Sequence, residues 1–339
     1  MSSLTDLLTS QGIKMCPAGD CVSTNSQKTT LAIPLEQYRV LSIKGPDCWK
    51  FLQGQLTCDM DEVKNRGSSL GAHCNIKGHM LSLFRIMRIA DDEVWLRMDA
   101  SIFDTAVTNL KKYIVFSKAE ACEITDQVTG LGLLGPGATA VIDKLFERVP
   151  SEDNGIISLN QGAVVRVPGD RFELWVTQDK LPDHLSNVPD RVGIGAIDAW
   201  QLSEINAGIP DLRPETQEAF IPQMTNLQAL AGVSFRKGCY TGQEIVTRLQ
   251  HRGQLKKSMY LVSTSSPQPP QPLQKVLTAE QQSCGQVVLA ASDNDGQYRL
   301  LAVITKKAAD QGELFLEDGS QLQLESLPYT LDPALFLPK

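Results

Sequence analysis

Residues 237–248 read Lys-Gly-Cys-Tyr-Thr-Gly-Gln-Glu-Ile-Val-Thr-Arg, and they hold the most specific pattern in the chain. Thr241 and Glu244 have the spacing of a capping box, so they predict that a helix begins here. Gly253 is the expected end of that helix, because glycine commonly follows the last helical residue. Cys239 is therefore expected to lie just before a helix N-terminus.

The surroundings of Cys239 favour the charged form of its thiol. The positive end of the helix dipole and the neighbouring cations Arg236 and Lys237 both stabilise a thiolate. Gly238 and Gly242 allow the backbone to turn tightly and to approach a ligand. Two interpretations stay open at this point: a functional thiol, or a buried structural cysteine in a glycine-rich turn.

Basic residues dominate the sequence around this cysteine, where Glu244 is the single carboxylate. A basic surface of this kind suits an anionic ligand, such as a polyglutamate tail or a phosphate backbone. A solvated helix face is the alternative. The basic residues of the first group are Arg236, Lys237, Arg248, His251, Arg252, Lys256 and Lys257, and a second group holds Lys111, Lys112 and Lys118.

Length and composition predict a globular, cytoplasmic protein of two or three domains. The chain has 339 residues, of which 42% are apolar and 21% charged. It has no apolar run of the ~18 to 20 residues that a membrane helix needs, and no secretory signal. The formal net charge of −7 argues against broad nonspecific binding of nucleic acid. The eight cysteines include no C-x-x-C pair, so we expect no metal site.

The pattern along the chain divides it into three parts. Residues 1–30 are rich in Ser and Thr and are expected to form a flexible N-terminal arm. Residues 31–256 alternate strand and helix signals, which favours an α+β fold, in two subdomains. Residues 257–339 hold short strand candidates between turn formers and predict a small β-barrel.

Individual elements can be predicted within the α+β region. Residues 38–43 and 114–116 are expected to be strands, and a helix should follow Gly45 and Pro46. Ser101 and Asp104 have the spacing of a helix cap. Residues 130–135 fit G-x-G-x-x-G, but their glycines lie within an apolar strand run and not at a strand-to-helix turn. A dinucleotide site is therefore not expected there.

The segment 237–248 resembles the signature of the YgfZ family, K-G-C-[FY]-x-G-Q-E-x-x-x-[RK], at every position. The resemblance extends to L-Q-G-Q-x-T and A-H-C-x-x-K-G motifs and to the sequence Leu-Lys-Lys-Tyr-Ile-Val-Phe-Ser-Lys. It spans about residues 35–260. The matching segments are 51–57, 72–78, 110–118, 207–210 and 220–227, with a Pro-Tyr pair at 328–329.

The resemblance implies folate-binding domains, related to the glycine-cleavage T-protein, arranged around a central cavity. It also implies a role in maintaining iron–sulfur enzymes, including those that thiomethylate tRNA. The family's folate lies beside two tryptophans. Trp200 matches one of them, and Tyr38 stands at the other position, where it keeps an aromatic face but lacks the indole N–H. The signature cysteine corresponds to Cys239, and its cations Lys237 and Arg248 are assigned to folate.

Three functions remain open at this stage. The first is a folate-dependent accessory factor, acting with tetrahydrofolate that carries a polyglutamate tail, for iron–sulfur client proteins and indirectly for tRNA. The second is a tetrahydrofolate-dependent aminomethyltransferase. Asp99 and Asp104 lie in the region of the T-protein carboxylate, but without its surrounding motif. The third is a non-catalytic tRNA-binding scaffold.

Overall fold

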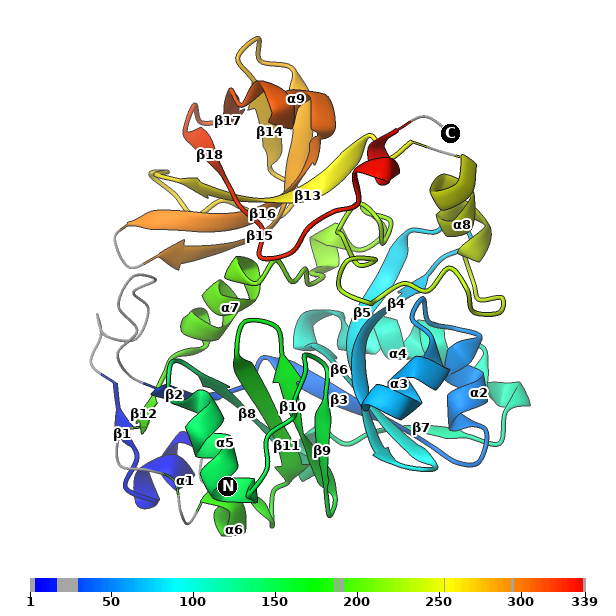
Figure 1. The fold of residues 1–339 in the computed structure, drawn as a ribbon, viewed down its shortest axis with the longest axis vertical. Helices are drawn as coiled ribbons and strands as arrows, with labels where there is room; N and C mark the ends of the chain where they lie inside the picture. The colour runs from blue at the N-terminus through cyan, green and yellow to red at the C-terminus, as the bar shows by residue number, and fades with distance from the viewer. Residues whose placement is uncertain are drawn as a thin grey trace.

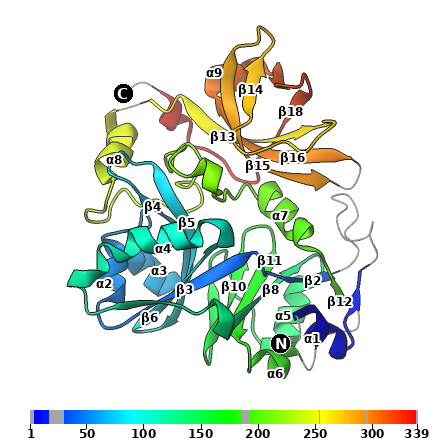
Figure 2. The same cartoon turned by 180° about the vertical axis from the view of Figure 1, so that it is seen from behind.

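The computed structural model describes residues 4–16, 30–185, 188, 192–252, 254–293 and 296–337. Two β-sheets lie side by side, a β-barrel lies above them, and helix α7 (Ile197–Asn206) lies between the sheets and the barrel (Figure 1). The view from behind shows the same arrangement (Figure 2). The predicted α+β class with a C-terminal barrel is confirmed.

The first sheet is buried on both faces. Its order within the described ranges is β1-β12-β2-β8-β11-β10-β9, with the first three strands parallel and the others antiparallel. Helices α1, α5 and α6 cover one face, and the other face packs against the second sheet. The strands are β1 (Lys14–Met15), β2 (Thr30–Pro34), β8 (Val128–Leu134), β9 (Ile156–Leu159), β10 (Gly162–Val167), β11 (Arg171–Thr177) and β12 (Val192–Ile194); the helices are α1 (Leu4–Ser10), α5 (Ala138–Phe146) and α6 (Leu181–Leu185).

The predicted flexible arm is in part folded. Residues 4–16 form α1 and β1, and Leu8 is fully buried because α1 places it against the first sheet. Residues 17–29 lie outside the described part of the chain.

The second sheet has the order β4-β5-β6-β3-β7 in the described part of the chain, and its neighbouring strands are antiparallel. Helices α2, α3 and α4 pack their apolar sides on one face. The helix predicted after Gly45 and Pro46 is α2. The elements are β3 (Tyr38–Lys44), α2 (Cys48–Gln53), α3 (Met60–Arg66), β4 (Ser68–Cys74), β5 (Met80–Ala90), β6 (Glu93–Asp99), α4 (Phe103–Lys111) and β7 (Glu120–Glu123).

Two local predictions in this sheet were wrong. Residues Ile114–Phe116 form a short 3-10 helix, η2, because the chain turns there from α4 toward β7 and no strand lies beside it. The predicted cap at Ser101 is also replaced. Asp99 accepts a hydrogen bond from the Ser101 backbone N–H at 2.9 Å and caps the 3-10 helix η1 (Ala100–Ile102). A further 3-10 helix, η3 (Thr125–Gln127), leads into β8.

The C-terminal domain is a closed barrel of order β13-β16-β15-β14-β17-β18 in the described ranges. Five of its strands lie on segments predicted as strands, whereas β14 was missed because only four residues form it. Its elements are β13 (Lys257–Thr264), β14 (Lys275–Thr278), β15 (Ser283–Asp293), β16 (Gln297–Thr305), α9 (Lys306–Gln311), β17 (Leu314–Leu316), β18 (Gln321–Glu325) and η5 (Pro333–Phe336).

Helix α7 joins the three parts. Trp200 faces the core between the two sheets, while Leu202 and Ile205 face the barrel. The segment that follows, residues 207–242, contains η4 (Pro214–Thr216) and leads to α8 (Gln243–Arg252). Its buried amides hold neighbouring parts together: Asn226 Nδ2 donates to the Met259 carbonyl at 2.8 Å, and Gln223 Nε2 donates to the Val246 carbonyl at 2.6 Å.

Candidate functional site

Two cavities meet at Tyr38, the first residue of β3. The smaller one, of about 230 Å³, lies where α7 meets the barrel, and we call it the central cavity. The larger one, of about 480 Å³, lies between α1, β8 and β11, and we call it the lateral cavity. Residues lining the central cavity are Tyr38, Gln201, Glu204, Ile205, Asp211, Arg213, Pro269, Pro270, Gln271, Pro272, Leu289 and Ala290.

Charged groups are concentrated at the central cavity. The Arg213 guanidinium lies 2.9 Å from an Asp99 carboxylate oxygen and 3.1 Å from one of Asp211. Burial raises the pKa of Asp211, and the neighbouring Arg213 opposes that rise. Glu204 is bound at 2.6 Å by Arg171, which lies behind the cavity. The cavity therefore offers a guanidinium and two carboxylates beside an aromatic ring.

A buried ion pair supports Tyr38 from behind. The Arg97 guanidinium lies over the Tyr38 ring, 3.9 Å from its centroid, and its Nε lies 3.3 Å from Glu173 Oε2. The same Glu173 oxygen accepts a hydrogen bond from Trp175 Nε1 at 2.7 Å. Glu173 is fully buried, so losing Arg97 would leave the Glu173 carboxylate without its ion-pair partner in the core.

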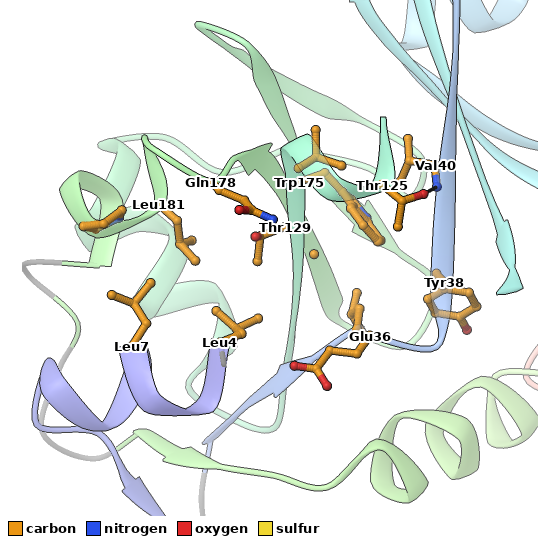
Figure 3. A pocket seen from close by; sticks show the side chains of 14 residues that line it. Leu4, Leu7, Glu36, Tyr38, Val40, Thr125, Thr129, Trp175, Gln178 and Leu181 are labelled. Carbon is orange, nitrogen blue, oxygen red and sulfur yellow. Dashed lines mark hydrogen bonds between the residues drawn. The ribbon is translucent and has the colours of Figure 1, made fainter. Parts of the chain in front are cut away.

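The lateral cavity has a different character. Figure 3 shows Leu4, Leu7 and Leu181 on one side and Trp175 on the other, with Glu36 and Thr129 between them. Glu36 is the charged residue of this lining, whereas the central cavity also has a cation. The hydroxyl of Tyr38 points away from the other lateral side chains (Figure 3).

Trp200 lies next to the central cavity but is not part of its lining. Its side chain is 0% exposed and packs on β8, where a Cβ on Gly132 would come within 2.6 Å of the indole ring. Arg171 lies 4.8 Å from the ring centroid. Trp200 Nε1 is a buried donor without a hydrogen-bond partner in the described structure.

Cys239 lies in the loop before α8 and is exposed, so the alternative of a buried packing cysteine does not fit its position. The helix begins at Gln243, four residues later. Gly242 has a φ of +83°, and a Cβ there would lie 2.4 Å from the Asn75 carbonyl oxygen, so no larger residue fits. This contact fixes the loop against the hairpin between β4 and β5.

Lys237 is committed to the fold. Its ammonium donates to the carbonyl oxygens of Leu56 at 2.8 Å and Cys58 at 2.7 Å. Burial lowers the pKa of Lys237 to about 8. The side chain therefore holds residues 237–242, which we call the signature loop, to the second sheet, and its charge is directed into the protein.

The predicted site residues form two separate groups. Tyr38 borders the central cavity, and Trp200 lies beside it. Cys239 and Lys237 lie in the signature loop, and Arg248 is exposed on α8. Figures 1 and 2 both place α8 at one edge of the molecule, away from α7.

Other cysteines differ from Cys239 in burial. Cys48, Cys58, Cys74 and Cys284 are buried, and burial raises the pKa of each thiol, to about 12 for Cys58 and Cys74. Cys122 is exposed, and partial burial and Glu120 raise its thiol pKa. No group of three His, Cys, Asp or Glu side chains that could hold a metal ion is found among the described residues.

The two candidate carboxylates also separate. Asp99 is buried and pairs with Arg213 at the central cavity. Asp104 is 86% exposed and pairs with Arg39 on the surface at 3.2 Å. Glu204, Asp211 and Arg213 of the central cavity were not predicted from the sequence. Their signal was a set of charges within and after the apolar helix that carries Trp200, close to Gly208.

His73 is buried beside the signature loop without a hydrogen-bond partner for either ring nitrogen in the described structure. Burial, together with Lys112, lowers the pKa of His73 to about 4 from its usual 6.5. The folded protein therefore holds this imidazole neutral in a range where the unfolded chain protonates it.

We expect this histidine to destabilise the fold in acid. As the pH falls from 6.5 to 4, the unfolded state takes up a proton that the folded state does not, so stability is lost by up to about 3 kcal/mol. Urea unfolding at several pH values measures the loss. His73→Gln should flatten the slope, while the control His79→Gln keeps it. Equal slopes for His73→Gln and the unmodified protein would refute the assignment.

Comparisons with known proteins identify the fold and the family of the chain. Residues 30–169 match the family model of the GCVT N-terminal domain. The glycine cleavage system aminomethyltransferase T of Bartonella henselae is similar in structure, with a TM-score of 0.74 and 16% identity over 96% of each chain. The fold is that of a glycine-cleavage T-protein.

The tRNA-modifying protein YgfZ of Cronobacter sakazakii is 36% identical over 89% of this chain and 94% of its own length, and that of Yersinia enterocolitica is 32% identical over 91% and 95%. The chain belongs to the YgfZ family. Helices long and apolar enough to span a membrane are absent from the described residues.

Proposed function

We propose that the chain is a folate-binding accessory protein of the cytoplasm that supports iron–sulfur enzymes and, through them, the thiomethylation of tRNA. The central cavity is the observation that supports the proposal. It brings together an aromatic ring, two carboxylates that each pair with an arginine, and a guanidinium, in a chain with the T-protein fold. The relatives from Yersinia enterocolitica and Cronobacter sakazakii are tRNA-modifying proteins by name, which supports the link to tRNA.

The residues of the central cavity fit a folate. A pterin has a flat ring that Tyr38 can contact. Its N–H groups can donate hydrogen bonds to the carboxylates of Glu204 and Asp211. Arg213 suits the carboxylates of a glutamate tail. Trp200 Nε1, a buried donor without a partner, lies behind this wall. The folate supplies one-carbon chemistry, and the residues of this chain bind it and keep it from water.

The proposed ligand is tetrahydrofolate with a polyglutamate tail. The basic residues Lys111 and Lys112 suggested a ligand with a polyglutamate tail. In the structure, Lys111 ends α4 and Lys112 follows it, and neither lines the central cavity. Arg213 is the cation of that lining and is already paired with Asp99 and Asp211. The dependence of affinity on tail length should therefore be shallow.

Tyr38 should govern the affinity for tetrahydrofolate. Stacking on an aromatic side chain is worth about 1–3 kcal/mol, so Tyr38→Leu should weaken binding roughly tenfold or more. Tyr38→Phe retains the ring and should bind nearly as well. Isothermal titration calorimetry measures both variants, after circular dichroism has confirmed that they are folded.

A control separates the two cavities, since Tyr38 borders both. Thr129→Met fills part of the lateral cavity and leaves the central one unchanged. It should bind tetrahydrofolate with unchanged affinity. Equal affinities for Tyr38→Leu and Tyr38→Phe, or loss of binding in Thr129→Met alone, would contradict a folate in the central cavity.

A further inference from the structure

One edge of the molecule gathers exposed apolar side chains. Eight large apolar residues are exposed among those that the structure describes, and five of them lie at this edge. Phe116 is 94% exposed, and Val115 beside it is 71% exposed. Exposed apolar side chains that gather in one region of a surface mark an interaction site. The five residues are Ile76, Tyr113, Val115, Phe116 and Ile245.

Three contacts bring these residues to one edge. Gly78, in the hairpin turn that carries Ile76, lies against Ile245 of α8, with a Cβ-to-Cβ separation of 3.1 Å for a Cβ placed on the glycine. Tyr113 contacts His73 edge to face, with ring centroids 6.2 Å apart, and His73 is the second-last residue of β4, the strand that leads into the hairpin. Val115 and Phe116 follow Tyr113 directly in η2.

Cations surround the apolar residues. They are exposed, and no ion pair joins them to a carboxylate in the described structure; Lys112 Nζ instead donates to Asn109 Oδ1 at 2.8 Å. Carboxylates also lie nearby. Glu244 is exposed on α8, and Glu218 accepts a hydrogen bond from Asn75 Nδ2 at 2.7 Å. Asp47 accepts a hydrogen bond from the Lys118 backbone N–H at 2.8 Å, and Glu120 is exposed two residues after Lys118. The cations are Lys77, Lys111, Lys112, Lys118 and Arg248, and with the five apolar residues they form what we call the basic apolar edge.

We propose that the basic apolar edge docks a protein partner whose matching face is acidic around an apolar centre. The cations attract and orient such a face, and the apolar side chains supply the buried contact. Three of the five apolar residues are aliphatic, which favours a protein over the stacked bases of an RNA. A second copy of this chain is disfavoured, because a two-fold contact would place cations against cations.

The signature loop lies beside the basic apolar edge, so a docked partner would lie close to Cys239. Gly242 packs on the same hairpin that carries Ile76 and Lys77, so the exposed Cys239 lies beside the basic apolar edge. A protein docked there meets the thiol. This inference rests on the proposed function, because it assigns the edge to the client protein that Cys239 serves. The folate experiments do not involve it, so the two can fail separately.

Photo-crosslinking in cells tests the docking surface. p-Benzoylphenylalanine is placed at position 116 or 76, and at Leu324 of β18 as an exposed apolar control in the barrel. The expected result is one acidic protein crosslinked at both 116 and 76 and absent at 324. No crosslink at 116, a crosslink to RNA, or a crosslink to a second copy of the chain would overturn the proposal.

The crosslinked protein is then purified and its affinity measured. Phe116→Ser and Lys112→Glu should each weaken binding about tenfold or more, as expected for central contacts in an interface, while Leu324→Ser leaves the affinity unchanged. Added salt should weaken binding by the unmodified chain more than by Lys112→Glu. Equal affinity for Phe116→Ser and the unmodified chain would overturn the proposal. Phe116 is exposed, so its replacement leaves the core intact.

Discussion

Replacing Cys239 with alanine is expected to abolish function in the cell without lowering the thermal midpoint. The side chain is exposed and lies outside the packed core, so its removal creates no cavity. A loss of tRNA thiomethylation in a knockout complemented with Cys239→Ala would then report lost chemistry. Mass spectrometry of tRNA nucleosides measures it, alongside a thermal melt.

Cys122 provides a matched control for this experiment. It is also exposed, on β7, but Glu120 and partial burial raise its thiol pKa. Cys122→Ala should complement fully, and iodoacetamide should label Cys239 faster than Cys122 at neutral pH. Slow labelling of Cys239 together with full complementation by Cys239→Ala would refute the functional thiol. Fast labelling with full complementation would leave folate binding alone to carry the function.

The second large effect is expected from Trp200→Ala. Trp200 fills the space beside Gly132 between the two sheets and the helix α7. Truncation of a fully buried tryptophan to alanine costs about 3–5 kcal/mol. Affinity for tetrahydrofolate should also fall roughly tenfold, through the wall of the central cavity that α7 forms. Trp200→Phe should recover most of both losses.

Urea unfolding and calorimetry separate the two consequences of Trp200→Ala. Binding is measured at a temperature where the variant remains folded by circular dichroism. A loss of stability with unchanged folate affinity would remove Trp200 from the site and leave it as a core residue. A loss of stability below about 1 kcal/mol would contradict its packing against the first sheet.

The regular elements could be predicted because their signals are local. Alternating apolar residues and Asp-Gly turns are enough to place most barrel strands, and Gly45 with Pro46 indicates the start of α2. Gly253 was expected to end α8, and the last described helical residue is Arg252. The strand assignment of residues 114–116 failed because three apolar residues in a row do not show whether a partner strand exists.

The site was less accessible to prediction, because its residues meet only through the fold. Nothing near Lys237 in the sequence shows that its ammonium binds the carbonyls of Leu56 and Cys58. The family resemblance implied that Lys237 and Trp200 contribute to one folate site, whereas in the structure the signature loop lies at one edge and Trp200 lies in α7. The pairing of Arg213 with Asp99 spans more than a hundred residues and has no local signal.

Gly130 and Gly132 of β8, which fit a dinucleotide-binding pattern in the sequence, restrict which residues homologous proteins can carry at neighbouring positions. A Cβ on Gly130 would come within 2.4 Å of the Trp175 ring, and one on Gly132 within 2.6 Å of the Trp200 ring. Each glycine therefore leaves the space that one tryptophan ring occupies, and a larger residue there would clash with that ring. In an alignment of relatives, a larger residue at either glycine should be accompanied by a smaller residue at its tryptophan, and the two pairs should covary independently of each other.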